Sequence, residues 1–372
     1  MAKSKRRISL FDLIKCIAIL AVVCGHTATT KELNSNPALF YKAVYSFHMP
    51  LFFFAAGLSF SPRALRSWEE WRSFLRKGIL TLLVPYIVWA LIYCNFSFES
   101  VASVLYGSWR SLKAAGSLTS LWFLASLFVA KLFVQLLING LDYLGFRAPR
   151  NANECLGAGR AKYAVPGALL VIAGYFLVPT SCNLPWCVDS AVAAAGFILL
   201  GIALRNSLVE LSVQRRRVVI AAALLSCAVF GCILAFEGDG LAIAMMCRSE
   251  YGRPLVSLGL ALSGSALAVS AACLLRRLAD EWVKYLSLNG LIYIGRHTMG
   301  IFLLHKLMMQ ILIIPGLEAG LGACLPLGVI RCLGACAALT VSLLLCALIE
   351  RYVPQLIGVY GRESYGSRGE AV

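Results

Sequence analysis

Ten apolar segments, each close to the length of a membrane-crossing helix, recur along the 372-residue chain. A helix needs about 20 mostly apolar residues to cross the hydrocarbon core of a bilayer. Hydrophobic residues make up 60% of the chain and charged residues only 14%, whereas an ordinary soluble domain has about 25% charged residues. The sequence therefore predicts an all-α polytopic membrane protein, with residues 1–372 forming a single integral-membrane domain. The ten predicted spans are 9–27, 44–60, 78–96, 118–138, 164–180, 187–204, 218–236, 255–275, 291–314 and 326–349.

Basic residues are distributed unevenly among the connections between these spans. With the N-terminus in the cytoplasm, the cytoplasmic side carries 23 Lys and Arg residues and the opposite side carries six. This bias is the positive-inside rule, so we expect ten crossings, with the basic N-terminus 1–8 and the short tail 351–372 both in the cytoplasm. The net charge of +16 then reflects topology and attraction to anionic membrane lipids, and it predicts no nucleic-acid partner. A bacterial-type plasma membrane is the expected location.

The first predicted span carries three residues that are costly in hydrocarbon, namely Asp12, Lys15 and His26. Charged and titratable groups inside membrane helices are functional candidates by default. A helix turns about 100° per residue, so Lys15 and His26 lie on nearly the same face, roughly 16 Å apart along the axis. Asp12 lies one turn below Lys15 on the same side. Because imidazole titrates near neutral pH and can accept a proton from a hydroxyl group, His26 is the candidate general base.

The remaining histidines also belong to predicted spans. His48 lies at the mouth of the second span, and His297 and His305 lie in the ninth. We expect Asp12, His48 and His305 to support catalysis and His297 to have a structural role.

The basic stretch at 61–77 spaces its large apolar residues along one helix face, which predicts an interfacial helix on the inner leaflet. An alternative is that Arg76 and Lys77, at its end, border a cytoplasmic entrance for an anionic ligand. Together with Lys15 and Arg296, they offer positive charge to phosphate groups or to a developing oxyanion.

Most of the fourteen cysteines fall within apolar segments, where small side chains favour close helix packing. No Cys and His residues have the spacing of a zinc site, so the sequence predicts no metal. Cys182 and Cys187 bracket a short outer turn, and a disulfide between them is left open.

Five stretches of this sequence resemble the acyltransferase-3 family of membrane O-acyltransferases, especially its fucose 4-O-acetylase-like branch. They are FDLIKCIAILAVVCGH at 11–26, YSFHMPLFFFAAGLSF at 45–60, LLVPYIVW at 82–89, LWFL at 121–124 and IGRHTMGIFLLH at 294–305. The family pattern of a basic residue, ten residues and then a histidine corresponds to Lys15 and His26. Many family members have arginine where this chain has Lys15.

The resemblance implies transfer of an acyl group, usually acetyl, from cytoplasmic acetyl-CoA or another acyl-CoA. The implied acceptor is a hydroxyl group of an envelope or exported glycan or glycolipid. The expected donor-binding residues are Lys15, Arg76, Lys77 and Arg296, with His26 acting as a general base or as a covalent acyl carrier. The expected partners are membrane lipids, further copies of the chain or a glycan-assembly machinery.

Two other functions fit the same pattern. A transporter or flippase for a glycan-lipid or small substrate would use the histidines as a proton relay, and it would move substrate without consuming acyl-CoA. The other is a membrane sensor or accessory subunit that acts through a partner.

Overall fold

The computed structural model describes residues 9–28, 38–117, 119–146, 161–179, 182–214, 216–281, 288–322 and 324–360. These residues form helices, with no β-structure among them beyond a single bridge between Met245 and Glu250. The all-α prediction is confirmed. The basic N-terminus 1–8 and the tail beyond residue 360 lie outside the described residues.

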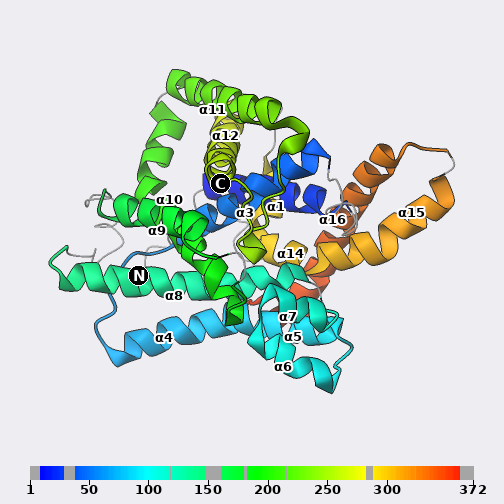
Figure 1. The fold of residues 1–372 in the computed structure, drawn as a ribbon, viewed down its shortest axis with the longest axis horizontal. Coiled ribbons are helices and arrows are strands. Elements are labelled where there is room, and N and C mark those ends of the chain that lie inside the picture. The colour runs from blue at the N-terminus through cyan, green and yellow to red at the C-terminus, as the bar shows by residue number, and fades with distance from the viewer. Residues whose placement is uncertain are drawn as a thin grey trace.

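All ten predicted spans are helical (Figure 1). In chain order, the long helices are α1 (Ser9–Gly25), α3 (Leu39–Ser59), α4 (Trp68–Gly78), α5 (Val84–Tyr93), α8 (Trp122–Tyr143), α9 (Ala161–Phe176), α10 (Val188–Gln214), α11 (Arg216–Glu237), α12 (Pro254–Glu281), α13 (Asn289–Arg296), α14 (Thr298–Leu307), α15 (Ile314–Leu321) and α16 (Leu327–Tyr352). The structure adds α6 (Phe98–Tyr106) and α7 (Trp109–Ala114), two short helices in a connection that the sequence pattern left without regular structure.

Six helical stretches in the described part of the chain are long and apolar enough to cross a membrane. They are Trp68–Tyr93, Thr119–Tyr143, Pro185–Ser212, Arg216–Glu237, Pro254–Leu278 and Leu327–Tyr352. The molecule is therefore a multi-pass helical membrane protein. The count of ten crossings and the side on which the termini lie stay predictions.

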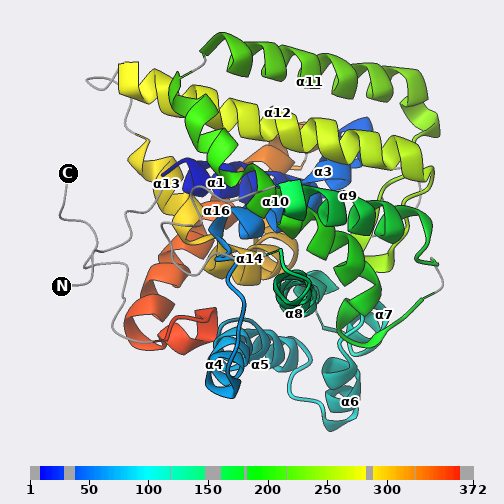
Figure 2. The same ribbon diagram turned by 90° about the vertical axis from the view of Figure 1, so that its left-hand side faces the viewer.

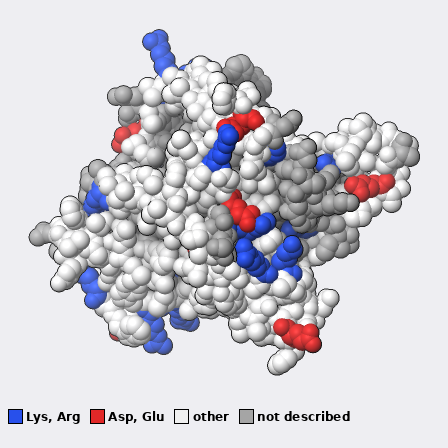
Figure 3. Space-filling view, in the orientation of Figure 1, with Lys and Arg blue, Asp and Glu red and all other residues white. Residues whose placement is uncertain are grey.

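Helices α1 and α3 occupy the middle of the molecule (Figures 1 and 2). The pair α11 and α12 lies along one edge, α4 and α5 lie along the opposite edge, and α15 projects from the body with the start of α16. Much of the face seen in Figure 3 carries neither acidic nor basic side chains, and the charged ones on it occur in separate groups. Such a surface suits contact with lipid, and it directs attention to the charged groups in the interior.

Glycines allow two backbone crossings next to the central helices. A Cβ atom at Gly57 of α3 would meet the carbonyl oxygen of Ile198 in α10, and one at Gly201 of α10 would meet that of Phe54. A Cβ atom at Gly295 of α13 would meet the carbonyl oxygen of Asp12 in α1. Small residues at helix crossings in membranes permit this closeness.

Helix α3 begins earlier than its apolar pattern predicts. It starts at Leu39 instead of residue 44, because Lys42 interrupts the apolar run and yet is buried inside the fold. Pro50 therefore lies in the interior of the helix and not near its start, and His48 lies within the helix and not at its mouth.

The predicted helix in 61–77 and the third predicted span join in one long helical rod, Trp68–Tyr93, with an irregularity near its centre. Helix α4 begins with a capping box, in which Glu70 N donates to Ser67 Oγ and Ser67 N donates to Glu70 Oε2. The π-helical turn η1 (Ile79–Leu83) then leads into α5, where Pro85 lies in the first turn. The wider π turn accommodates Pro85, which lacks an N–H donor, within the continuous rod. The predicted helix in 61–77 is confirmed, and its place on a leaflet stays a prediction.

The ninth predicted span is not one continuous helix. Helix α13 ends at Arg296, His297 has non-helical dihedral angles, and α14 begins at Thr298. A second irregularity, the π-helical turn η7 (Met308–Ile313), separates α14 from α15. Hydropathy alone does not show such breaks, because apolar residues continue across both.

Cys182 and Cys187 are both free thiols in the structure. The buried Cys187 Sγ instead donates to the carbonyl oxygen of Gly107 at 3.5 Å. The structure therefore has no disulfide between Cys182 and Cys187, which the sequence left open.

Gly57→Ala should lower the thermal stability of the purified protein, because the added methyl group meets backbone that cannot move aside cheaply. Overpacking of this kind costs about 1–3 kcal/mol or more. Gly140→Ala in α8 is the matched control, since a Cβ atom there meets nothing within 4 Å, and alanine in a helix is favoured over glycine. A thermal unfolding curve in detergent measures both, and equal midpoints for the two variants would contradict the tight crossing.

Candidate active site

His26 directly follows α1, and its backbone still continues the helix. Its N–H donates to the carbonyl oxygens of Val22 and Val23 at 3.0 and 3.2 Å. This position directs the imidazole into a cavity of about 90 Å³. The cavity is lined by Val22, His26, Tyr45, His48, Met49, Trp109, Thr119, Ser120, Trp122, Ala244, Met245, Met246, Cys247, Phe302 and Lys306. We call it the histidine cavity.

Three of the four histidines gather around this cavity. The ring centroids of His26 and His305 are 5.2 Å apart, and Tyr45 lies between His26 and His48, at 6.1 Å from the first ring and 5.0 Å from the second. Tyr45 Oη is 3.4 Å from His26 Nδ1. The sequence-based grouping of His26, His48 and His305 in one site is matched by this geometry.

Backbone contacts fix the tautomers of the two supporting histidines. His48 Nδ1 donates to the carbonyl oxygen of Val44 at 2.7 Å. His305 Nδ1 donates to those of Ile301 and Phe302 at 3.0 and 2.9 Å. A neutral imidazole with a proton on Nδ1 carries its lone pair on Nε2. His305 Nε2 is buried and has no hydrogen-bond partner, so it is an acceptor close to the ring of His26.

Lys306 is a functional candidate that sequence reasoning missed. Its side chain lines the histidine cavity and donates to Thr119 Oγ1 at 3.3 Å. A positive charge beside a general base can stabilise an oxyanion that forms in the transition state. The signal was present, since Lys306 is one of five basic residues inside the predicted spans.

The wall opposite α1 comes from two connections, α7 and residues 244–247. Trp109 lies between two cations, with Lys113 Nζ 5.3 Å and Arg248 Cζ 5.0 Å from its ring centre. Burial raises the pKa of the Cys247 thiol to about 12, so this cysteine stays protonated and is a poor nucleophile near neutral pH. His26 is therefore a better candidate than Cys247 for the reacting group.

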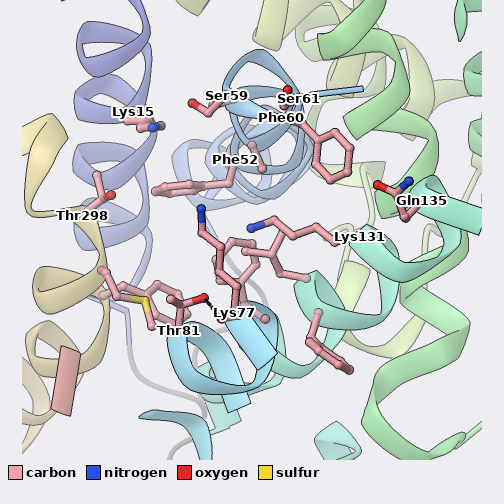
Figure 4. A pocket seen from close by; sticks show the side chains of 18 of the residues that line it. Lys15, Phe52, Ser59, Phe60, Ser61, Lys77, Thr81, Lys131, Gln135 and Thr298 are labelled. Atoms are coloured by element: carbon pink, nitrogen blue, oxygen red, sulfur yellow. Dashed lines mark hydrogen bonds between the residues drawn. The ribbon is translucent and has the colours of Figure 1, made fainter. Parts of the chain in front are cut away.

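A second and larger cavity, of about 410 Å³, lies where α1, α3, α4, α8 and α14 meet (Figure 4). We call it the lysine cavity, because Lys15, Lys77 and Lys131 extend into it from three different helices. Its lining is Lys15, Phe52, Ala55, Ala56, Ser59, Phe60, Ser61, Phe74, Lys77, Gly78, Thr81, Phe123, Leu127, Phe128, Lys131, Gln135, Thr298, Met299 and Phe302. No acidic side chain is among these described residues, so an anionic ligand would neutralise the three cations.

A polar clamp holds the loop at the edge of the lysine cavity. Asn139 of α8 accepts from Leu65 N at 3.1 Å and donates to the Leu65 carbonyl oxygen at 2.6 Å. Gln135 donates to the carbonyl oxygen of Arg63 at 2.9 Å. These bonds fix the segment that follows Ser61, so this side of the cavity is built into the fold.

The predicted donor-binding residues divide into two groups. Lys15 and Lys77 line the lysine cavity, whereas Arg76 is exposed and is not part of the lining. Arg296 Nε lies 3.5 Å from Asp12 Oδ2, and the Asp12 side chain is only 1% exposed. Asp12 and Arg296 therefore join α1 to α13 and line neither cavity. Lys131, which sequence reasoning did not select, takes a place in the lining instead.

His297, at the break between α13 and α14, contacts a carboxylate. Its Nε2 lies 3.2 Å from Glu350 Oε2, and its Nδ1 donates to the carbonyl oxygen of Tyr293 at 2.8 Å. The structural role expected for His297 agrees with these contacts. The sequence analysis assigned Glu350 no such partner, and 53 residues separate the two in the chain.

The two cavities lie on opposite sides of a single residue, Phe302, which lines both. The lysine cavity takes lining residues from the connection 61–77, which the charge count assigns to the cytoplasm. The histidine cavity takes them from connections assigned to the opposite side. Helix α1 places Lys15 in one cavity and His26 in the other.

A bundle of helices long and apolar enough to cross a membrane defines the class as a multi-pass membrane protein. The sequence model of a family described as an acyltransferase domain matches residues 8–351. The chain belongs to this acyltransferase-3 family.

A curated relative is the nodulation protein NolL of Sinorhizobium fredii (strain NBRC 101917 / NGR234). It is 33% identical over 148 residues, which are 36% of this chain and 38% of that protein. The matched region thus spans well under two thirds of the relative. No solved structure matches this chain.

Arg296→Ala should lower thermal stability, because it removes a cation that faces the buried Asp12 carboxylate. A hydrogen bond to a charged group contributes about 1.5–3 kcal/mol. Arg76→Ala, a change of the same kind at an exposed site, should leave the unfolding midpoint in place. An unchanged midpoint for Arg296→Ala would show that the pair does not hold α1 and α13 together.

Proposed function

We propose that this protein is a membrane O-acyltransferase that moves an acetyl group from acetyl-CoA to a hydroxyl group of an envelope or exported glycan, with His26 as general base. The observation that carries the proposal is the pairing of the two cavities. A cation-lined cavity sized for part of an anionic donor adjoins a histidine cavity, and Phe302 is the one described residue that lines both.

The donor end of the proposal rests on charge. Acyl-CoA carries its phosphates at one end and its thioester at the other. Lys15, Lys77 and Lys131 provide three cations in a cavity whose described lining holds no carboxylate. In this arrangement the phosphates lie on the lysine side and the thioester points toward Phe302.

The chemical step follows from the residues of the histidine cavity. An imidazole nitrogen of His26 accepts the proton of the acceptor hydroxyl, and the hydroxyl oxygen forms a bond to the thioester carbonyl carbon. The C–S bond then breaks, and the CoA thiolate leaves and takes up a proton. Lys306 faces the site where negative charge collects on the carbonyl oxygen. His305, whose lone pair is on Nε2, supports the charged imidazole of His26.

The acceptor end of the proposal rests on the opposite wall. Trp109 and residues 244–247 belong to connections that the charge count places outside the cytoplasm. An aromatic ring flanked by cations suits a sugar that approaches from that side. The fucose 4-O-acetylase-like branch remains our expectation for the acceptor class.

Lys77→Ala and Lys131→Ala should each weaken acetyl-CoA binding about tenfold, since a charge-assisted contact contributes about 1.5–3 kcal/mol and 1.4 kcal/mol is a factor of ten. The neighbouring Arg76→Ala is the matched control and should bind acetyl-CoA normally. Isothermal titration of the purified variants with acetyl-CoA measures the binding affinity. Acetyl-pantetheine, which lacks the nucleotide phosphates, is the comparison ligand. Equal losses for Arg76→Ala and Lys77→Ala would remove the lysine cavity as the donor site.

His26→Ala should reduce acetyl transfer by about 10²–10⁴-fold, the usual contribution of a general base, without weakening acetyl-CoA binding. Transfer of labelled acetyl groups from acetyl-CoA to a panel of glycans measures the rate. Full transfer by His26→Ala would exclude the assigned base. Flux of a glycan-lipid in proteoliposomes without acetyl-CoA consumption would instead favour a transporter.

A further inference from the structure

Phe302 is the wall between the two cavities, and it does not act alone. Its ring centre lies 5.1 Å from that of Phe123, which in turn lies 5.7 Å from that of Phe52. The three rings come from α3, α8 and α14, and each is less than a tenth exposed. We call Phe52, Phe123 and Phe302 the aromatic partition.

The neighbours of the partition place it directly on the route between the two sites. Phe52 and Phe123 line the lysine cavity, whereas Met49, one helical turn before Phe52, and Trp122, next to Phe123, line the histidine cavity. The Phe302 ring is 5.9 Å from that of His305, which lies against His26. A group that passes from the lysines to His26 must therefore pass these rings.

We propose that Phe302 limits the length of the acyl group that reaches His26, because it closes off the small histidine cavity from the larger lysine cavity. This inference rests on the proposed function. The thioester sulfur stays tethered to the donor on the lysine side, so the acyl group enters the histidine cavity with its tail ahead of the carbonyl carbon. The tail must then fit inside about 90 Å³, a volume that it shares with the acceptor hydroxyl.

The volume favours the shortest acyl groups. The acyl tail and the acceptor hydroxyl share this cavity of about 90 Å³, so each added carbon leaves less room for the acceptor. An acetyl group has three non-hydrogen atoms, whereas a hexanoyl group has seven. In a hydrophobic pocket even one additional methylene group changes selectivity by roughly 10–200-fold. A smaller side chain at 302 would join the two cavities and remove this limit.

The test uses 2-bromoacyl-CoA reagents of two, four and six carbons as probes. In each, the reactive carbon is the one next to the carbonyl group, so its position is the same while the tail lengthens. A His26 nitrogen forms a bond to that carbon, bromide leaves and the ring releases a proton. Mass spectrometry of the digested protein gives the extent of labelling at His26, and N-acetylhistidine corrects for the intrinsic reactivity of each reagent.

Wild-type protein should be labelled at His26 by the two-carbon reagent at least about tenfold faster than by the six-carbon reagent, in line with the cost of extra methylene groups. Phe302→Leu should bring the two rates close together, and Phe302→Trp should slow even the two-carbon reagent. Phe47→Leu is the matched control. Phe47 lies on the same helix as Phe52 but packs against Phe230, lines neither cavity and should leave the wild-type ratio unchanged.

Two results would separate this inference from the proposed function. Labelling of His26 with the same length dependence in wild type and Phe302→Leu overturns the role of Phe302 and leaves the proposed function standing. No labelling of His26 in wild type by the two-carbon reagent overturns the proposed function and this inference with it.

Discussion

The cost of placing charge in hydrocarbon governs the interior of this protein. Each lysine, aspartate or histidine within a membrane helix must either pair with another group or face a cavity. The fold uses both solutions. Asp12 pairs with Arg296 and lines neither cavity, whereas Lys15, one turn further along α1, lines the lysine cavity. Two charged residues that are equally costly to place in hydrocarbon thus have different roles: one joins two helices and the other lines a cavity.

Helix α1 connects the two sites because of its length and its periodicity. Lys15 and His26 lie on nearly one face, so a straight helix directs both toward the same neighbours, α3 and α14. The close approach of Gly295 to the Asp12 backbone, and the Asp12–Arg296 contact, fix α1 against α13. The break at His297 then lets α14 take its own direction, bring Phe302 and Lys306 to the cavities and place His305 against His26.

The sequence predicted individual residues of this site better than the residues that they contact. Periodicity within one helix is enough to place Lys15 and His26 on a common face, and apolar segment lengths are enough to predict the multi-pass helical class. Lys131 and Lys306 were missed because their roles depend on which helices become neighbours, and a pattern within one span carries no such information. Arg296 and Glu350 are similar cases, since their partners lie 284 and 53 residues away.

The break at His297 shows a second limit of pattern analysis, and it also gives the site its asymmetry. An apolar run continues through residues 291–314, so hydropathy describes one helix, whereas the backbone turns at His297 and again at the π turn after Leu307. Helix α14 is the short stretch between these two irregularities. It holds Phe302 between the cavities, with Thr298 and Met299 facing the lysines and Lys306 facing His26. An unbroken helix through residues 291–314 would carry the same side chains. Its direction, however, would be set entirely by the crossing of α13 over α1. Two local breaks allow one end of this region to pack tightly on α1 while residues of α14 line both cavities.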